Sequence, residues 1–214
     1  MKIVRLAMAL GLLIPALAQA QDVELTAYGG YNLGGSIDVS EDQIQKFDTG
    51  DSFATGLSLT WQRGPTYAFE AFWGWRSTEI TGRNPVTYQD EHVTDLDEHD
   101  FHANFLFMPA YSTSKITPFF LVGLGATYMN PGEVMGVSPD GVTKFSWALG
   151  AGGKTALNER IGLRGQVRYH STYVTDEYSG TWCDPWYGCY NTVDSNWLDE
   201  WEFTLGLVFR VGRR

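Results

Sequence analysis

Residues 201–211 read Trp-Glu-Phe-Thr-Leu-Gly-Leu-Val-Phe-Arg-Val. The odd-numbered positions are all large and apolar, whereas the even-numbered positions include Glu202, Thr204 and Arg210. This period of two predicts a β-strand with one apolar face. Aromatic residues stand near both ends of that face, as they do on the lipid-facing strands of membrane barrels, so the charged face would point into a lumen.

The amino-terminal segment has the pattern of an export signal. Lys2 and Arg5 precede an apolar run at 6–17, which is followed by Ala-Gln-Ala. A basic start, a short apolar segment and small residues before the cleavage point predict a secretory signal peptide over 1–20. The run is too short for a transmembrane helix, which needs ~20 apolar residues, although an amphipathic or core helix is an alternative. The remaining residues, 21–214, would form one barrel domain.

Composition narrows the class of protein further. The chain has a formal net charge of −10, and its basic residues form no cluster. This balance argues against binding to nucleic acid. Aromatic residues make up 14% of the sequence, and the apolar residues alternate with polar ones instead of forming another long run. The composition therefore favours a β protein without transmembrane helices.

Seven other segments repeat the alternation of the last strand. They are 23–33, 53–61, 67–76, roughly 97–111, 118–128, 145–154 and 161–170. Short connections at 63–66, 112–115 and 157–160 alternate with long polar connections at 35–51, 78–96, 129–142 and 172–199. Eight strands joined in this way predict an all-β, eight-stranded antiparallel up-and-down transmembrane β-barrel. The alternative is a secreted lipocalin-like barrel, which would need its apolar faces inward and its charges outward.

Two motifs give the chain a resemblance to a known family. Pro118-Phe119 precedes Gly123-Leu124-Gly125, and the alternation at 201–209 ends on an aromatic residue. With these motifs the chain resembles the small eight-stranded outer-membrane barrels, the OmpA-type transmembrane domain and its relatives, although residues 210–214 extend past the usual terminal aromatic. The resemblance implies a monomer in the bacterial outer membrane, in contact with lipid and lipopolysaccharide and inserted by the barrel-assembly machinery.

The inward faces of the expected strands carry charges of both signs. The expected lumen charge network consists of Glu24, Glu70, Lys154, Arg164, Arg168, His170, Glu202 and Arg210. Strand order would place Arg210 beside Glu24. Glu202 would lie beside Arg168 and His170. Glu70 would reach across the lumen to Lys154 and Arg164. Because eight strands enclose a space that side chains can nearly fill, these pairs predict a plugged lumen.

The expected fourth long connection contains the only two cysteines, Cys183 and Cys189. Two close cysteines in an exported chain predict a disulfide. Aromatic residues surround them, namely Trp182, Trp186, Tyr187 and Tyr190. A stiffened loop rich in aromatic residues could recognise an unknown extracellular ligand. The alternative is that the disulfide simply protects the loop from proteolysis.

Acidic residues gather in two other expected connections. They are Asp38, Glu41, Asp42 and Asp48, and Asp90, Glu91, Asp95, Asp97, Glu98 and Asp100. We interpret them as a solvated acidic surface. The alternative is that they share divalent cations with lipopolysaccharide phosphates, because such cations prefer oxygen ligands. No residue is assigned to a dedicated metal, cofactor or catalytic site.

An enzymatic role is the least favoured of three functions. Lipid A deacylase barrels carry a His-x-Ser pair on a late strand, whereas this chain has His170, Ser171 and Thr172. Adjacent residues of a strand point to opposite faces, so Ser171 cannot pair with His170, and Thr172 is a different nucleophile. We expect a protein that is not an enzyme, with a structural or surface-interaction role in the cell envelope. A narrow channel for small solutes is the alternative.

Overall fold

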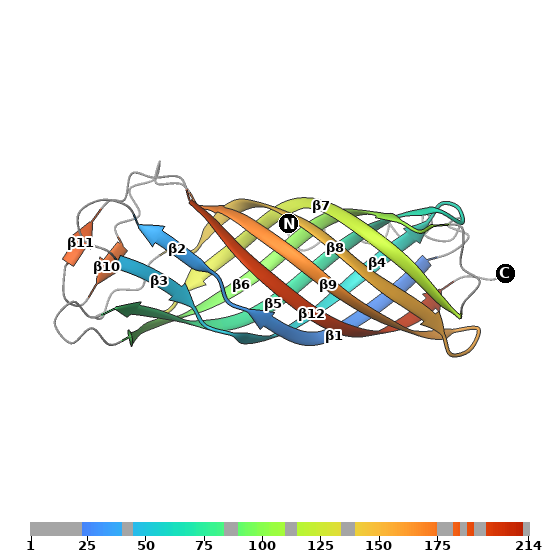
Figure 1. Cartoon of the computed structure of the whole chain (residues 1–214), viewed down its shortest axis with the longest axis horizontal. Coiled ribbons are helices and arrows are strands. Elements are labelled where there is room, and N and C mark those ends of the chain that lie inside the picture. The colour runs from blue at the N-terminus through green and yellow to red at the C-terminus, as the bar shows by residue number, and fades with distance from the viewer. Residues whose placement is uncertain are drawn as a thin grey trace, which may run out of the picture.

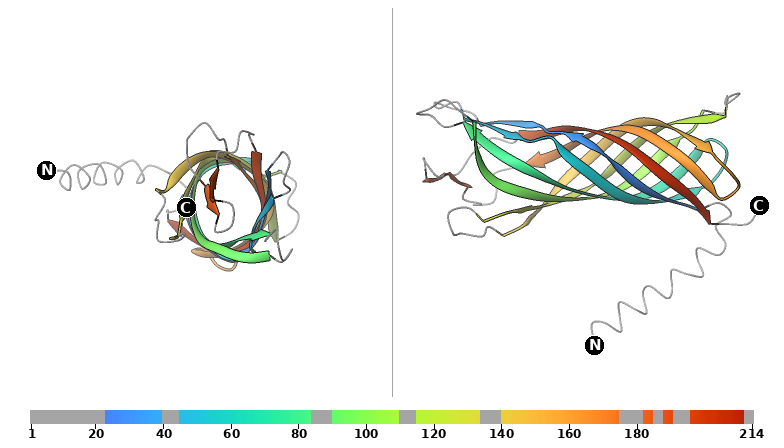
Figure 2. Two further views of the ribbon diagram at one scale, coloured as in Figure 1. Left: turned by 90° about the vertical axis from the view of Figure 1, so that its left-hand side faces the viewer. Right: turned by 90° about the horizontal axis from the view of Figure 1, so that it is seen from below.

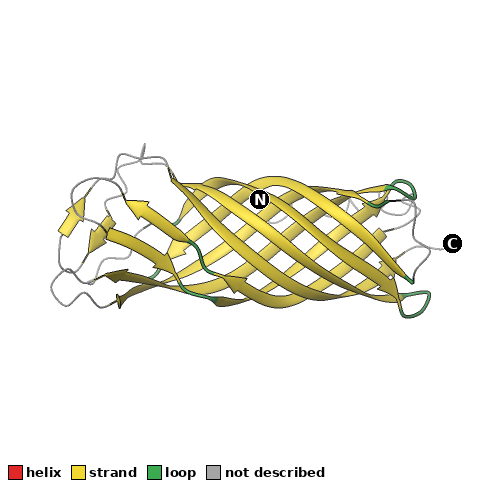
Figure 3. Ribbon diagram, viewed as in Figure 1, coloured by secondary structure: helices red, strands yellow, loops and turns green. Residues whose placement is uncertain are grey.

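The computed structural model describes residues 23–39, 45–83, 90–109, 115–133, 140–174, 182–184, 188–190 and 196–211. The expected signal peptide, Tyr111, Trp186 and Tyr187 lie outside these residues. All regular structure in the described part is β (Figure 3). This part of the chain holds no helix that is long and apolar enough to cross a bilayer.

Eight long strands form a closed antiparallel barrel (Figures 1 and 2). They are β1 (Val23–Leu33), β4 (Ser52–Gln62), β5 (Tyr67–Arg83), β6 (Asp90–Phe107), β7 (Ile116–Pro131), β8 (Val142–Ala156), β9 (Ile161–Val174) and β12 (Asn196–Val211). Each strand pairs with the next one along the chain, and β1 pairs with β12 to close the ring. The expected eight-stranded up-and-down barrel is confirmed.

Four short strands form two hairpins at one end of the barrel. They are β2 (Ser36–Val39), β3 (Gln45–Thr49), β10 (Trp182–Asp184) and β11 (Gly188–Tyr190). β3 also pairs with the end of β5. We call this end the loop end, and the opposite end, where β1 begins and β12 finishes, the turn end (Figure 1).

The strands are longer than the sequence pattern predicted. The expected connection at 78–96 is mostly β5 and β6, which pair with each other as far as Arg83 and Asp90. The connection at 35–51 contains β2 and β3, and 172–199 is shortened because β9 and β12 extend toward each other. Backbone pairing does not need an apolar face, so these strands continue after the outward residues become polar. In contrast, β6 ends at Phe107 and not near residue 111.

Side chains are sorted by strand alternation, with apolar residues outside. The outward residues Leu205 and Phe53 are 76% and 65% exposed, whereas the inward residues Thr60 and Glu70 are 1% and 2% exposed. A water-soluble fold would have the reverse arrangement. The barrel therefore presents an apolar surface to its surroundings and encloses a polar interior.

Candidate functional site

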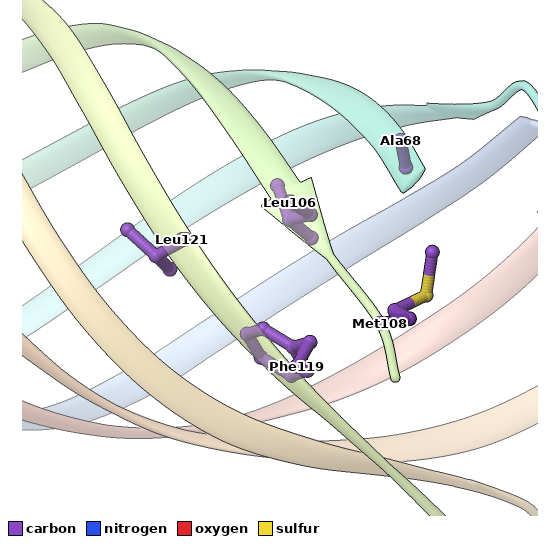
Figure 4. Close-up of a cluster of buried hydrophobic side chains, with 5 residues drawn as sticks. All are labelled: Ala68, Leu106, Met108, Phe119 and Leu121. Atoms are coloured by element: carbon purple, nitrogen blue, oxygen red, sulfur yellow. The ribbon is translucent and has the colours of Figure 1, made fainter. Parts of the chain in front are cut away.

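The lumen is closed at the turn end by an apolar cluster. Ala68, Leu106, Met108, Phe119 and Leu121 contact one another there, and all are buried (Figure 4). Four of them come from β5, β6 and β7, and Met108 follows the end of β6 (Figure 4). Gly152 faces the same space, where an added Cβ would lie 2.5 Å from the Phe119 ring, so glycine is needed for the close approach.

Next to this cluster an ion pair crosses the lumen, and its guanidinium lies 4.4 Å from the Phe119 ring. Arg164 of β9 binds Glu70 of β5, a strand on the opposite side of the ring. Glu70 also accepts hydrogen bonds from Ser58 at 3.0 Å, Thr60 at 2.9 Å and Asn104 at 2.9 Å. A buried ion pair needs such additional partners to offset the cost of removing both charges from water.

A second group of charges lies nearer the turn end. Lys154 donates to Glu24 at 2.9 Å, and Arg210 donates to the other oxygen of Glu24 at 3.2 Å. The expected contact of Lys154 with Glu70 is wrong. Lys154 stands beside Arg164 in the register of β8 and β9, but Arg164 already binds Glu70, so the lysine extends to Glu24 instead.

A third group of polar and charged side chains, centred on Arg168, lies toward the loop end. Arg168 binds Glu202 at 3.4 Å, donates to Nδ1 of His102 at 3.1 Å and stacks over the Phe72 ring at 3.7 Å. The other ring nitrogen of His102 lies 2.9 Å from the Ser146 hydroxyl. A guanidinium against an aromatic face gains cation–π stabilisation when it is shielded from water.

The densest group of charges surrounds Arg76, which is 2% exposed. Its guanidinium binds Glu98, Asp100 and Glu200. Thr127 donates to Asp100 at 2.7 Å. Sequence reasoning placed Glu98 and Asp100 on a solvated loop, which is wrong because β6 includes both and turns them inward.

His170 belongs to the same group. Its ring nitrogens lie 3.5 Å from Asp100 and 3.5 Å from Glu200. The expected contact of His170 with Glu202 is wrong, because the register of β9 and β12 places His170 opposite Glu200 and Arg168 opposite Glu202.

Sequence reasoning did not include Arg76, His102 or Glu200 in the lumen charge network. The signal that could have identified them was their position on the inward face. Arg76 and Glu200 are in phase with Glu70 and Glu202, and His102 alternates with the outward residues Phe101 and Phe105 of its own strand.

A second apolar cluster lies beyond the Arg76 group. It consists of Ile80, Leu96, Met129 and Leu198, with Val174 packed against them. The described lumen thus has apolar clusters toward both ends, with the pair of Glu70 and Arg164 and the Arg76 group between them. Its central charged side chains are almost completely inaccessible, including Arg76, Arg164 and Arg168 at 2% each. The side chains fill the space, as the geometry of eight strands allows.

The β10–β11 hairpin carries Cys183 and Cys189 as directly opposed residues. Opposed residues of antiparallel strands have Cα atoms ~4.5–5.5 Å apart, a separation that a disulfide can bridge. Trp182 and Tyr190 are also opposed in this hairpin. The side chains themselves fall outside what the structure describes, so the disulfide stays a prediction.

The geometry defines a class of protein: a small barrel with a lipid-facing exterior and a closed polar interior. Residues 6–210 match the family described as the outer membrane protein beta-barrel domain. The chain belongs to this family and is a small outer-membrane β-barrel protein of the bacterial outer membrane. The comparison with curated proteins gave no match.

Solved structures share the fold at low sequence identity. The outer membrane protein OprG from Pseudomonas aeruginosa is 13% identical with a TM-score of 0.64, over 91% of this chain and 97% of that one. The outer membrane protein AlkL, solved in lipid bilayers, is 14% identical with a TM-score of 0.58, over 90% and 92%. Neisserial surface protein A is 10% identical with a TM-score of 0.56, over 89% and 97%.

Proposed function

We propose that this barrel does not conduct solutes and that it has a structural or surface-interaction role in the cell envelope. The observation that supports this proposal most directly is the filled lumen, in which Glu70 and Arg164 join strands on opposite sides of the ring. A permanent aqueous pore would leave such charges in contact with water, yet both are 2% exposed. The same ion pairs would make the barrel a rigid support for whatever its loop end presents.

The position of His170 supports a role without catalysis. His170 lies 3.3 Å from the Thr172 hydroxyl, but both side chains are buried inside the barrel, where a lipid substrate could not reach them. Ser171 points to the outer face and donates to Asp199 at 2.6 Å. A nucleophile and a general base need both hydrogen-bond reach and access to the substrate. His170 and Thr172 have the reach without the access, and Ser171 lies on the opposite face from His170.

The loop end is the surface we assign to the cell exterior. β5 and β6 continue there beyond their outward apolar residues, and the β10–β11 hairpin lies at the same end (Figure 1). Outer-membrane barrels have short periplasmic turns and longer extracellular loops. Partners would therefore meet the hairpin of Cys183 and Cys189.

The test compares three strains: one with the intact gene, one with the gene deleted, and one whose protein lacks 182–190. A role in the envelope predicts that deletion raises detergent sensitivity while uptake of small solutes stays unchanged. Restoration by the full protein, but not by the shortened one, would identify the hairpin as the interacting part. Slower solute uptake in the deletion strain with unchanged detergent resistance would favour the channel instead. Altered lipid A in mass spectra would favour an enzyme.

A further inference from the structure

The outer face of β12 carries an unusual pattern near the loop end. Trp197, Asp199 and Trp201 alternate along the strand and therefore share its outward face. The two tryptophans are 42% and 49% exposed, and Asp199 is exposed between them. A carboxylate between two tryptophans interrupts the apolar face, so contact with acyl chains alone does not explain the pattern.

Neighbouring aromatic rings hold both tryptophans in place. Trp201 packs on Tyr169 with centroids 5.2 Å apart, and Trp197 packs on Tyr173 at 4.9 Å. Trp147 joins the two pairs, at 5.4 Å from Tyr169 and 6.4 Å from Trp197. Because the rings are already packed, a ligand that stacks on them would lose little side-chain entropy on binding.

Asp199 is also fixed, but its hydrogen-bonding capacity is not used up. Ser171 donates to Oδ1 at 2.6 Å. A carboxylate has about four acceptor sites, so about three remain for donors from a ligand. The exposed face of Asp199 can therefore bind hydroxyl groups.

Other strands have different outward residues from β12 at the level where they leave the apolar band. On β5, Trp75 is followed outward by Ser77 and Glu79. On β6 the corresponding outward positions include Asp97 and Asp95. Of β5, β6 and β12, β12 alone alternates tryptophan, carboxylate and tryptophan on its outer face. A uniform aromatic belt around the barrel therefore does not fully explain this pattern.

We propose that Trp197, Asp199 and Trp201 bind the uncharged sugar headgroup of a glycolipid in the outer leaflet. A sugar ring combines apolar C–H faces, which stack on aromatic rings, with hydroxyls that donate to a carboxylate. A phosphate headgroup would be repelled by Asp199. Below Trp201 the same face continues as Phe203, Leu205 and Leu207, with Leu205 76% exposed. This apolar stripe is where the acyl chains lie, and it favours a lipid-linked sugar over a free one.

The experiment is native mass spectrometry of the purified barrel in detergent. The probes are dihexosyl diacylglycerol and phosphatidylcholine with identical acyl chains, added in equal amounts. The wild type should retain the glycolipid about tenfold better, as expected for charge-assisted hydrogen bonds. Asp199→Asn and Trp197→Ala should each lose this preference. Trp75→Ala is the matched control, because Trp75 is also 42% exposed, and it should keep the preference.

Three outcomes overturn the proposal: equal retention of the two lipids by the wild type, an equal loss in Trp75→Ala, and full competition by the free disaccharide. The last result would assign the face to a soluble glycan. Heat-shifted migration on gels checks that each variant is folded. If Trp197→Ala does not fold, the nearly isosteric Asp199→Asn decides the question alone.

Discussion

At the scale of single residues, the pair of Glu70 and Arg164 gives the sharpest stability prediction. Glu70→Ala leaves the buried Arg164 guanidinium without its carboxylate, so the free energy of unfolding should fall by about 3–5 kcal/mol. Replacing both residues, with Arg164→Met, should recover part of the loss. Urea unfolding followed by tryptophan fluorescence measures the change. Glu79→Ala, on the outward face of the same strand, is the control and should stay within about 0.5 kcal/mol of the wild type.

Two carboxylates beside Arg76 should differ in their importance. Asp100 also accepts a hydrogen bond from Thr127 and lies 3.5 Å from His170, whereas Glu98 is held by its ion pair with Arg76. Three carboxylates around one guanidinium repel one another, so Glu98→Gln relieves repulsion and should change stability by less than about 1 kcal/mol. Asp100→Asn should lower stability by about 2–3 kcal/mol. Equal losses in the same unfolding measurement would contradict this ranking.

Alternation indicated the inward face of the charged residues on the central parts of the strands, but Glu98 and Asp100 were assigned to a loop and Glu200 was not included. Strand order also indicated three partners, because the structure pairs Arg210 with Glu24, Arg168 with Glu202 and Arg164 with Glu70. It did not indicate that Lys154 binds Glu24 or that His170 lies opposite Glu200. These contacts depend on how eight strands are staggered around a closed barrel, which local pattern does not encode.

At the scale of the elements, the β10–β11 hairpin predicts a disulfide between Cys183 and Cys189. The mature protein isolated without reductant should gain two alkyl groups in intact mass only after reduction. We expect this bond because the two cysteines are directly opposed in the hairpin and because an exported protein matures in an oxidising compartment. Two free thiols in the unreduced sample would contradict the prediction.

Single cysteines test which end of the barrel faces outward. Asp140→Cys lies at the loop end and Asn158→Cys at the turn end, and both native residues are exposed. In a background with Cys183 and Cys189 replaced by serine, a membrane-impermeant maleimide should label intact cells only at 140. Labelling at 158 should appear once the outer membrane is permeabilised. The opposite pattern would reverse the orientation.

The sequence predicted the central part of every long strand and missed most of the extensions. Between 78 and 96 the outward residues turn acidic, which suggested a loop. The inward positions nevertheless continued as Thr78, Ile80 and Leu96, all buried. A strand that leaves the bilayer keeps its backbone pairing but loses its apolar outer face, so hydropathy alone places its end too early.

At the scale of the whole molecule, buried side chains fill the interior of the barrel as they fill the core of a soluble protein, but many of them are charged. The Arg76 group and the pair of Glu70 and Arg164 lie between two apolar clusters, with Phe119 near one end and Met129 near the other. Eight strands give an interior just wide enough for such packing. The barrel would need to lose several ion pairs together before water could pass.

Single-channel recording in planar lipid bilayers tests this central claim most directly. The purified barrel should insert and show little or no steady conductance, while a known porin in the same bilayer serves as the positive control. A lipid-facing variant, Leu205→Ala, should behave like the wild type because it leaves the lumen unchanged. Large, steady conductance steps from the wild type would contradict the filled lumen and favour a solute channel.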